Sequence, residues 1–210
     1  MLRERGKAES EPRADGRALR YQHRRPELLE AVLQHLLEHG LNGQSVRTLA
    51  DAVGVSHVTL RHHFGSREQL LAEVFKTILK HAAIPAHFAG NDLVWVVREQ
   101  WQRWSQPDGQ RYFRLAFEVY GVAVSRPEQH KEFLVGMVSD YIDLIVTRLV
   151  ELGYRRSKAA GLATRVLAQI RGLLMDLLAT GDNERVTTAF EEFASLLTYE
   201  LSQTLARSGG

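Results

Sequence analysis

Apolar residues recur every three to four positions along most of the chain, which is the spacing of one face of an α-helix. In the first third, this spacing predicts a helix that begins at Pro26 and ends at Gly40. Three shorter helices follow, and Ser45, Ser56 and Ser66 stand where their N-terminal caps are expected. No segment shows the period-two alternation of a half-buried strand, so the pattern predicts a helical fold.

Beyond residue 84 five longer helices are predicted, and turns that contain proline or glycine separate them from one another. Asp182 is placed to cap the last of these helices. The longest apolar runs span only a few residues, whereas a membrane-spanning helix needs about 20. We therefore expect an all-α protein of about nine helices that has no membrane partner.

Composition narrows the possible chemistry. With 44% hydrophobic and 25% charged residues, the chain of 210 residues has an ordinary globular composition. It has no cysteine, which excludes disulfides, thiol nucleophiles and cysteine-based zinc sites. The signatures of serine hydrolases, phosphate-binding loops and zinc proteases are also missing, and His35 and His39 lack a third ligand. We expect no enzyme activity, no metal and no cofactor, and, without a secretory signal, a cytoplasmic protein.

Positive charge is concentrated at the N-terminus. Residues 1–25 hold seven arginines and one lysine against four acidic residues, a net charge of +4 that leaves −2 for the rest. These residues show no apolar periodicity, which predicts a flexible arm. Such an arm can reach for nucleic acid, or it can be a solvated tail without a partner.

Two of the short predicted helices are joined by a tight turn at Gly54, a residue type that adopts turn conformations costly for others. Leu49 and Val53 on the first helix can face Leu60 and Phe64 on the second. This is the arrangement of a helix-turn-helix, whose second helix enters the major groove of DNA.

The predicted exposed face of the second helix carries His57, Val58, Arg61 and His62. These side chains offer hydrogen-bond donors, a cation and an apolar surface that could meet a thymine methyl group. No acidic residue occurs from residue 53 to residue 66, where one would be repelled by phosphate. The segment is therefore suited to reading DNA.

This region resembles the TetR family of bacterial transcription regulators. The resemblance is carried by Ser45, Leu49-Ala50, Ala52-Val53-Gly54-Val55-Ser56, Leu60, His63-Phe64-Gly65-Ser66 and Glu68-x-Leu70-Leu71. It covers about the first third of the chain, and the remainder agrees in the number and length of helices. The resemblance implies a homodimeric repressor that binds a palindromic operator and releases it when a small effector enters the C-terminal domain.

The resemblance also implies roles for single residues. Ser45 and His63 would bond phosphate, and Arg67 stands where the family usually has lysine. Val58 occupies a position where glycine or proline is usual, and Arg61 one where a backbone-contacting tyrosine is usual. Arg61 can still hold phosphate or read guanine, so these departures affect the operator sequence rather than DNA binding itself.

The basic arm can be interpreted in the same way. Family members with long basic tails are thought to lay them along the minor groove, and Arg17 and Arg20 lie close enough to do this. The alternative is that only Arg24 and Arg25 touch phosphate. The candidate DNA contacts are Arg20, Arg24, Arg25, Ser45, Arg47, Ser56, His57, Val58, Arg61, His62, His63 and Arg67.

The expected organisation is a flexible basic arm (1–25), a helix-turn-helix domain that includes the start of the fourth helix (26–83), and a helical effector-binding and dimerisation domain (84–210). Aromatic side chains concentrate in the third part and could line a cavity for a small apolar or aromatic effector, or could be ordinary core. The candidate pocket residues are Trp95, Arg98, Trp101, Trp104, Phe113, Phe117, Tyr120, Met137, Tyr141, Arg171 and Met175.

The last two predicted helices carry apolar stripes that could pair with a second copy of the chain or could close the core of one copy. The candidate dimer-interface residues are Leu162, Val166, Ile170, Leu173, Leu177, Phe190, Phe193, Leu197 and Leu201. The function expected is that of a ligand-responsive DNA-binding repressor. The alternatives are a DNA-binding regulator without a small ligand, and a helical binding protein or enzyme that does not bind DNA.

Overall fold

The computed structural model describes residues 16–82 and 93–208, together with the side chains of residues 24–81 and 93–203. Within these ranges every regular element is a helix, which confirms the all-α prediction. The helices are α1 (Gly16–His39), α2 (Val46–Ala52), α3 (His57–Phe64), α4 (Arg67–Ala82), α5 (Leu93–Ser105), α6 (Pro107–Ser125), α7 (Lys131–Glu151), α8 (Arg156–Thr180) and α9 (Asn183–Ser208).

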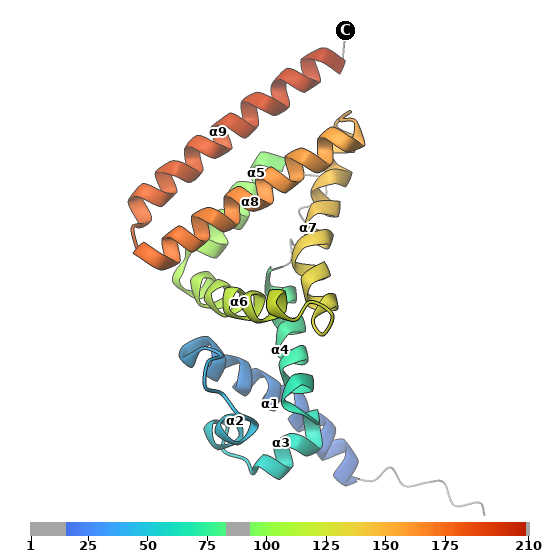
Figure 1. Ribbon diagram of the computed structural model, residues 1–210, viewed down its shortest axis with the longest axis vertical. Coiled ribbons are helices and arrows are strands. Elements are labelled where there is room, and N and C mark those ends of the chain that lie inside the picture. The colour runs from blue at the N-terminus through green and yellow to red at the C-terminus, as the bar shows by residue number, and fades with distance from the viewer. Residues whose placement is uncertain (1–15, 83–92, 209–210) are drawn as a thin grey trace, which may run out of the picture.

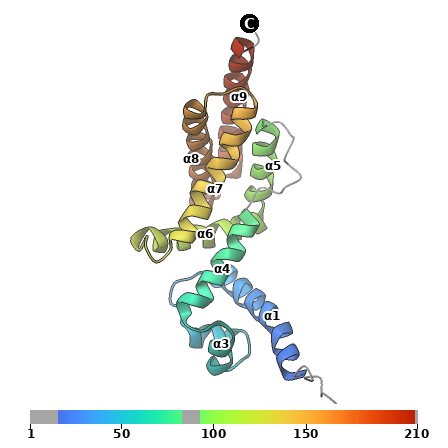
Figure 2. The same cartoon turned by 90° about the vertical axis from the view of Figure 1, so that its right-hand side faces the viewer.

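The helices form two tiers (Figure 1). The short helices α2 and α3 lie with α1 in the lower tier, and α5, α7, α8 and α9 form the upper tier. Both views show α4 rising from the lower tier towards the upper one, and α6 crossing between the two (Figures 1 and 2). The helix α4 is therefore the direct covalent link between the helix-turn-helix and the upper helices.

The first helix is longer than expected. It begins at Gly16, not at Pro26, and Pro26 lies inside it. The prediction of a flexible arm is therefore wrong for residues 16–25, whereas residues 1–15 lie outside the described part of the chain, as do the side chains of Arg17 and Arg20. Extending an existing helix adds one backbone hydrogen bond per residue fixed, and the alanine, leucine and arginines before the proline favour this extension.

Local polar contacts determine where the short helices start. The Ser45 hydroxyl accepts the backbone N–H of Thr48, and the Thr48 hydroxyl accepts the N–H of Ser45, which forms a capping box at α2. Ser56 caps α3 by accepting the N–H of Thr59. The turn between the two helices contains Gly54 at a φ of +71°, a backbone conformation that favours glycine.

The N-terminal core contains residues from both tiers. Leu33, Leu49, Leu60, Phe64 and their neighbours from α1–α4 pack in one cluster with side chains of α6 and α7. The α6 and α7 members are Leu115, Ala116, Val119, Ala123, Phe133 and Met137. The division between the cores therefore does not coincide with the boundary at residue 84 that the sequence suggested.

Polar contacts also attach α6 to the lower tier. The Glu118 carboxylate on α6 accepts the backbone N–H of Leu41, just beyond the end of α1, at 2.6 Å. Arg111, two turns earlier on α6, forms an ion pair with Glu38 of α1 at 3.5 Å. These two contacts hold α6 against α1 and the loop that follows it.

The C-terminal core is built from α5–α9 and is rich in large side chains. Trp101 of α5 stacks on Phe190 of α9, with ring centroids 4.5 Å apart and nearly parallel planes. Leu149, Val166 and Leu174 are fully buried around this pair. Among the residues described, no helix is long and apolar enough to cross a membrane.

Candidate functional site: a nucleic-acid interface and an internal cavity

The helix α3 presents two different faces. Leu60 and Phe64 are buried in the N-terminal core and fix the helix in place. His57, Val58, Arg61 and His62 are exposed, which agrees with the face expected from the sequence. Val58 is 64% exposed, although a side chain of this kind gains free energy from burial. An exposed face with donors, a cation and an apolar residue is suited to the floor of a major groove.

The surroundings of α3 are basic. Arg47 on α2 and Arg24 on α1 are exposed, as are the capping serines Ser45 and Ser56. The pKa of His63 is lowered from 6.5, first by burial and then by the positive charges of His62, Arg25 and Arg24. His63 is therefore mainly neutral at pH 7, and its position at the end of α3 can provide a polar contact without adding positive charge.

Two of the candidate DNA contacts have an intramolecular task. Arg25 of α1 donates to the Glu73 carboxylate of α4 at 2.6 Å and to the backbone oxygen of His63 at 3.2 Å. Its guanidinium also lies 4.9 Å from the centre of the Phe64 ring. Arg67 donates through Nε to the backbone oxygen of Gln44 at 2.7 Å. Both arginines hold α3 or the loop before α2 against neighbouring helices, a role that sequence reasoning missed.

A cavity of about 280 Å³ lies where the helices α4, α5, α6, α7 and α8 approach one another. Its wall contains Leu79, Trp104, Phe113, Gly136, Met137, Asp140, Tyr141, Leu144, Leu167, Ile170 and Arg171. Five of the predicted pocket residues are among them: Trp104, Phe113, Met137, Tyr141 and Arg171. The cavity therefore combines an apolar wall with a small number of polar groups, as ligand sites do.

Six predicted pocket residues lie outside this cavity. Trp95 and Met175 are exposed at 42% and 55%, because they lie on the outer faces of α5 and α8. Trp101 is occupied by its stacking contact with Phe190, and Arg98 forms an ion pair with Glu191 of α9.

The remaining two support the cavity indirectly. Phe117 packs against the C-terminal core next to Phe113, with ring centroids 5.9 Å apart. The Tyr120 ring lies 5.6 Å from the guanidinium carbon of Arg171. Helical phase alone could not separate these two positions from the cavity wall, because they lie one and two turns beyond Phe113 on the same helix.

Residues that the sequence did not single out complete the wall. The sequence placed Ile170 in a dimer interface and gave Leu79 no role, yet both line the cavity. Gly136 offered the one sequence signal, a glycine inside a helix. A Cβ atom at this glycine would lie 2.9 Å from Cδ1 of Leu79, so its absence lets α7 approach α4 closely.

The polar groups of the cavity wall are unusual. The indole nitrogen of Trp104 and the hydroxyl oxygen of Tyr141 are buried and have no hydrogen-bond partner among the residues that the structure describes. Burial raises the pKa of Tyr141, so its hydroxyl stays protonated at neutral pH. Arg171 donates to the backbone oxygen of Met137, and burial lowers its pKa, which means that the cation is poorly solvated there.

The outer surface of α8 and α9 differs from the interface expected from the sequence. Val166, Ile170, Leu177, Phe190 and Leu201 face the core of the same chain, so the prediction placed them on the wrong side. The outer side holds a groove of about 570 Å³ whose apolar wall includes four other predicted interface residues, Leu162, Leu173, Phe193 and Leu197.

Exposed apolar residues flank this groove. Leu196 is 69% exposed on α9, Tyr199 is 65% exposed one turn away, and Met175 is exposed on α8. The apolar stripe of each helix is wide enough to serve both the core and this outer surface. An apolar pattern shows that a face is buried, but it does not show which partner buries it.

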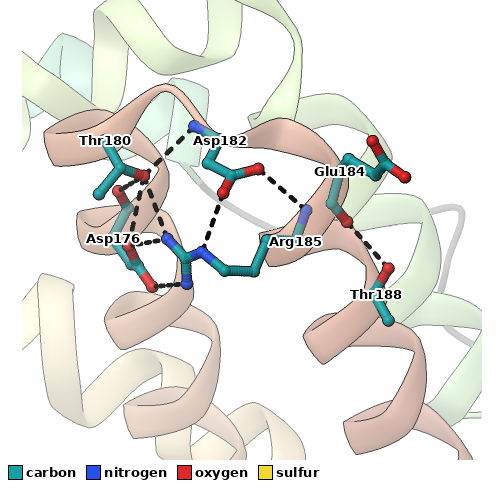
Figure 3. Close-up of polar contacts among 6 residues, drawn as sticks. All are labelled: Asp176, Thr180, Asp182, Glu184, Arg185 and Thr188. Atoms are coloured by element: carbon teal, nitrogen blue, oxygen red, sulfur yellow. Dashed lines mark hydrogen bonds and ion pairs between the residues drawn. The ribbon is translucent and has the colours of Figure 1, made fainter.

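A polar cluster fixes the turn between α8 and α9 (Figure 3). The Arg185 guanidinium donates to both oxygens of Asp176, at 2.8 and 2.7 Å, and to Asp182 at 3.1 Å. These bonds lower the pKa of Asp176. Asp182 also accepts the backbone N–H of Arg185, which confirms that it caps α9. The cluster ties the end of α8 to the start of α9.

The exposed recognition helix, its capped partner α2 and the buried contacts between them define a helix-turn-helix protein. The sequence pattern of the bacterial regulatory proteins of the tetR family matches residues 28–74. The N-terminal helix-turn-helix domain of this chain is therefore similar to that of the TetR-family regulators.

The comparisons with single proteins agree with this assignment. The HTH-type transcriptional repressor KstR2 of Mycolicibacterium smegmatis is 39% identical over 56 residues, which are 27% of this chain and 27% of that protein. The chain therefore matches only about a quarter of the length of this curated relative.

Solved structures cover more of the chain. A transcriptional regulator from Rhodococcus sp. Rha1 superposes with a TM-score of 0.67 at 19% identity, over 82% of this chain and 94% of that one. Salmonella enterica GusR superposes with a TM-score of 0.65 at 25% identity, over 87% of this chain and 95% of that one. The helical fold of most of the chain, and not only the helix-turn-helix, is thus shared with these proteins.

Proposed function

We propose that this protein is a homodimeric transcriptional repressor that binds a palindromic DNA operator and releases it when a small molecule occupies the internal cavity. It would act in the cytoplasm, and not as an enzyme. The observation that carries the DNA-binding part is the exposed, acid-free face of α3, with His57, Val58, Arg61 and His62 held outward by the buried Leu60.

Contacts to DNA divide into two kinds. His57, Val58 and Arg61 lie on the exposed face of α3 and would meet base edges. Arg24, at the exposed end of α1, and Arg47, on α2, would meet phosphate and contribute affinity without sequence preference. In this assignment Arg25 and Arg67 position the recognition helix rather than reading the DNA.

The outer surface of α8 and α9 is the proposed dimer interface. Leu196 and Tyr199 are the exposed apolar residues beside the groove, and they would be covered by the same residues of a second copy. A two-fold dimer places its recognition helices in major grooves about 34–36 Å apart, or a multiple of this distance, which explains why a palindrome is expected.

The substitution Leu196→Glu places a charge in this interface and should convert the dimer into a monomer, as sedimentation velocity would show. Val135→Glu, which places a charge on an exposed apolar residue of α7, is the matched control and should leave a dimer. A dimer that persists in L196E at micromolar concentration would contradict the proposed interface.

The cavity is connected to the DNA-binding helices in two ways. Leu79 of α4 lies in its wall, and Met137 of α7 belongs both to the wall and to the N-terminal core. A ligand that favours one spacing of these helices would shift the distance between the two recognition helices of the dimer. A coupling free energy of about 1–3 kcal/mol corresponds to a loss of operator affinity of about 5–150-fold.

The decisive experiment is selection from a randomised duplex pool, followed by fluorescence anisotropy of the selected DNA across a salt series. We expect enrichment of a palindrome and an affinity that falls steeply as salt rises, because phosphate contacts release counterions. No enrichment together with no salt dependence would remove the DNA-binding function. Enrichment of a single half-site without symmetry would leave DNA binding but contradict the dimer.

A further inference from the structure

The cavity wall contains three polar side chains that act mainly as hydrogen-bond donors. The indole nitrogen of Trp104 can only donate, and so can the guanidinium of Arg171. The Tyr141 hydroxyl is protonated and is available to donate. Trp104 and Tyr141 are close to each other, with ring centroids 5.9 Å apart. Both side chains carry a buried polar atom that has no partner in the described part of the chain, and such atoms cost free energy until an acceptor reaches them.

The charge of Arg171 is also uncompensated. Within the described residues Arg171 contacts the backbone oxygen of Met137 and both the ring and the side-chain oxygen of Tyr120, and no carboxylate lies within ion-pair distance of it there. A buried cation is stabilised most by an anion that enters the same low-dielectric space. The remaining wall is apolar, with Leu144, Leu167 and Ile170 among its members.

We propose that the effector is an apolar molecule with a single carboxylate, whose anionic oxygens are held by Arg171 together with the Trp104 and Tyr141 donors. This inference rests on the ligand-binding role proposed above and specifies the chemistry of that site. The apolar part of the ligand contacts Leu144, Leu167 and Ile170.

One residue of the cavity wall would favour a ligand of positive charge. Asp140 also lines the cavity and could attract a cationic ligand. It is, however, an exposed residue, and a solvated carboxylate interacts with a ligand charge through water of high dielectric constant. Arg171 is less exposed than Asp140, so its interaction with an anion is screened less. The balance therefore favours an acid over an amine.

The volume limits the size of the ligand. A cavity of about 150 Å³ accepts benzene, and the cavity described here holds about 280 Å³. It therefore has room for two fused aromatic rings with one small substituent. Aromatic side chains on two sides, Trp104 and Phe113, provide faces against which such rings can pack.

The test uses three probes of one shape and different charge: 2-naphthoate, 2-naphthamide and 2-naphthylmethylammonium. Their affinities for the full-length protein without DNA are measured by isothermal titration calorimetry. We expect 2-naphthoate to bind at least ten-fold more tightly than the amide, and the ammonium compound to bind most weakly. Equal or tighter binding of the ammonium compound, or binding of none of the three up to millimolar concentration, would overturn the proposal.

Variants identify the residues responsible. Arg171→Gln should remove most of the preference for 2-naphthoate over 2-naphthamide, and Arg171→Lys should retain part of it. Tyr141→Phe removes only a hydroxyl that has no partner in the free protein, so it should weaken naphthoate binding several-fold without lowering the melting temperature. If Y141F and R171Q both bind naphthoate with wild-type affinity, the proposed head-group site is wrong.

Operator release is a separate measurement. Anisotropy of the labelled operator with added 2-naphthoate reports whether occupancy of the cavity weakens DNA binding. Naphthoate that binds in calorimetry without releasing DNA would contradict the proposed ligand-controlled release but would leave the proposed head-group chemistry intact. Preference for the ammonium compound, combined with release of DNA, would contradict the proposed head-group chemistry but would leave ligand-controlled release intact.

Discussion

The two tiers of the molecule place their functional polar groups in opposite ways. In the lower tier, the hydroxyls of Ser45 and Ser56 bond backbone N–H groups only three residues away, and the helices they start are fixed locally. In the upper tier, the polar atoms of Trp104 and Tyr141 are buried around a cavity and have no partner. The first arrangement yields a surface whose capping bonds are already formed, and the second leaves two donors without a partner among the described residues.

This difference bears on how each tier performs its task. A recognition helix has to present the same side chains to every operator, so its position should change little. A cavity with unpartnered donors has a free energy that falls when an acceptor enters, which allows a ligand to favour one conformation. The shared helices α6 and α7 pack into both cores, so they connect the two kinds of site.

The largest predicted effect concerns the close packing beside the cavity. Gly109 of α6 approaches the end of α5, and a Cβ atom there would lie 2.3 Å from the backbone oxygen of Arg103 and 2.7 Å from Cα of Trp104. Backbone cannot move aside as a side chain can. Gly109→Ala should therefore lower the free energy of unfolding by about 3 kcal/mol or more in urea titrations.

The matched control is Gly121→Ala in the same helix. No atom lies within 4 Å of a Cβ built at Gly121, and the residue is exposed. Alanine is favoured over glycine inside a helix, so G121A should raise the free energy of unfolding by about 0.5–1 kcal/mol. Equal stability of the two variants would show that the packing of α5 against α6 is looser than described.

The next effect concerns the exposed side chains of α3, which should matter for DNA binding and not for folding. Arg61→Ala removes an exposed side chain of α3 without disturbing the buried Leu60 and Phe64. We expect a loss of about 1–3 kcal/mol in operator binding, with relaxed preference at the base pair that Arg61 reads, and no change in melting temperature. The measurement is anisotropy against the selected operator and its single-position variants.

Arg156→Ala is the control for charge alone. Arg156 is exposed at the start of α8 in the upper tier, far from α3 in both views (Figures 1 and 2). It should leave operator affinity unchanged within a factor of two. If R61A and R156A weaken binding to the same extent, α3 is not the element that reads the DNA.

Sequence reasoning was most successful where contacts are local. The caps at Ser45, Ser56 and Asp182 join residues three apart, so their spacing was visible in the chain. The exposed face of α3 followed from the same helical period. The bond between Arg25 and Glu73 spans 48 residues, and no local pattern could indicate it.

In the upper tier, the sequence indicated the helices but not the partner of each face. The apolar stripe of α8 was taken as a dimer interface, yet Val166 faces the core and Ile170 lines the cavity. Both assignments require burial, and a helical period is the same for each. Proline occurs both at helix starts and inside helices, so the sequence predicts a start at Pro26 whereas α1 begins at Gly16.

A pair of hydroxyl deletions tests the contrast between the tiers directly. Ser56→Ala removes the cap of α3 and should cost about 1 kcal/mol of unfolding free energy. Tyr141→Phe removes a buried hydroxyl without a partner and should cost less than about 0.3 kcal/mol or increase stability. Urea titrations at one protein concentration measure both.

Ser139→Ala is the reference, because this hydroxyl on the exposed surface of α7 neither caps a helix nor lines the cavity. It should change the free energy of unfolding by less than about 0.5 kcal/mol. If S56A and Y141F lose equal stability, the Tyr141 hydroxyl has a structural bond in solution and the contrast between the tiers fails. Such a result would also weaken the assignment of this hydroxyl to a ligand.

The smallest predicted effect is a pH dependence of the lower tier. His63 has a pKa below 6.5 in the folded protein, chiefly because of burial and also because of the positive charges of His62 and Arg25. The unfolded chain therefore takes up a proton at this position at a higher pH than the folded chain does. Stability is retained in full above pH 6.5 and falls as the pH drops from 6.5 towards the lower folded pKa.

His63→Gln removes this titration, so its loss of unfolding free energy between pH 7.5 and pH 5.5 should be smaller than that of the wild type. The difference should be well below 1 kcal/mol, because His63 is only partly buried and solvent screens its charge. His57→Gln removes an exposed histidine from the same helix and should keep the wild-type loss. If H63Q and H57Q lose the same unfolding free energy on acidification, the end of α3 is no more buried than its start. The recognition helix would then be packed less tightly in the lower tier than its caps and ion pairs indicate.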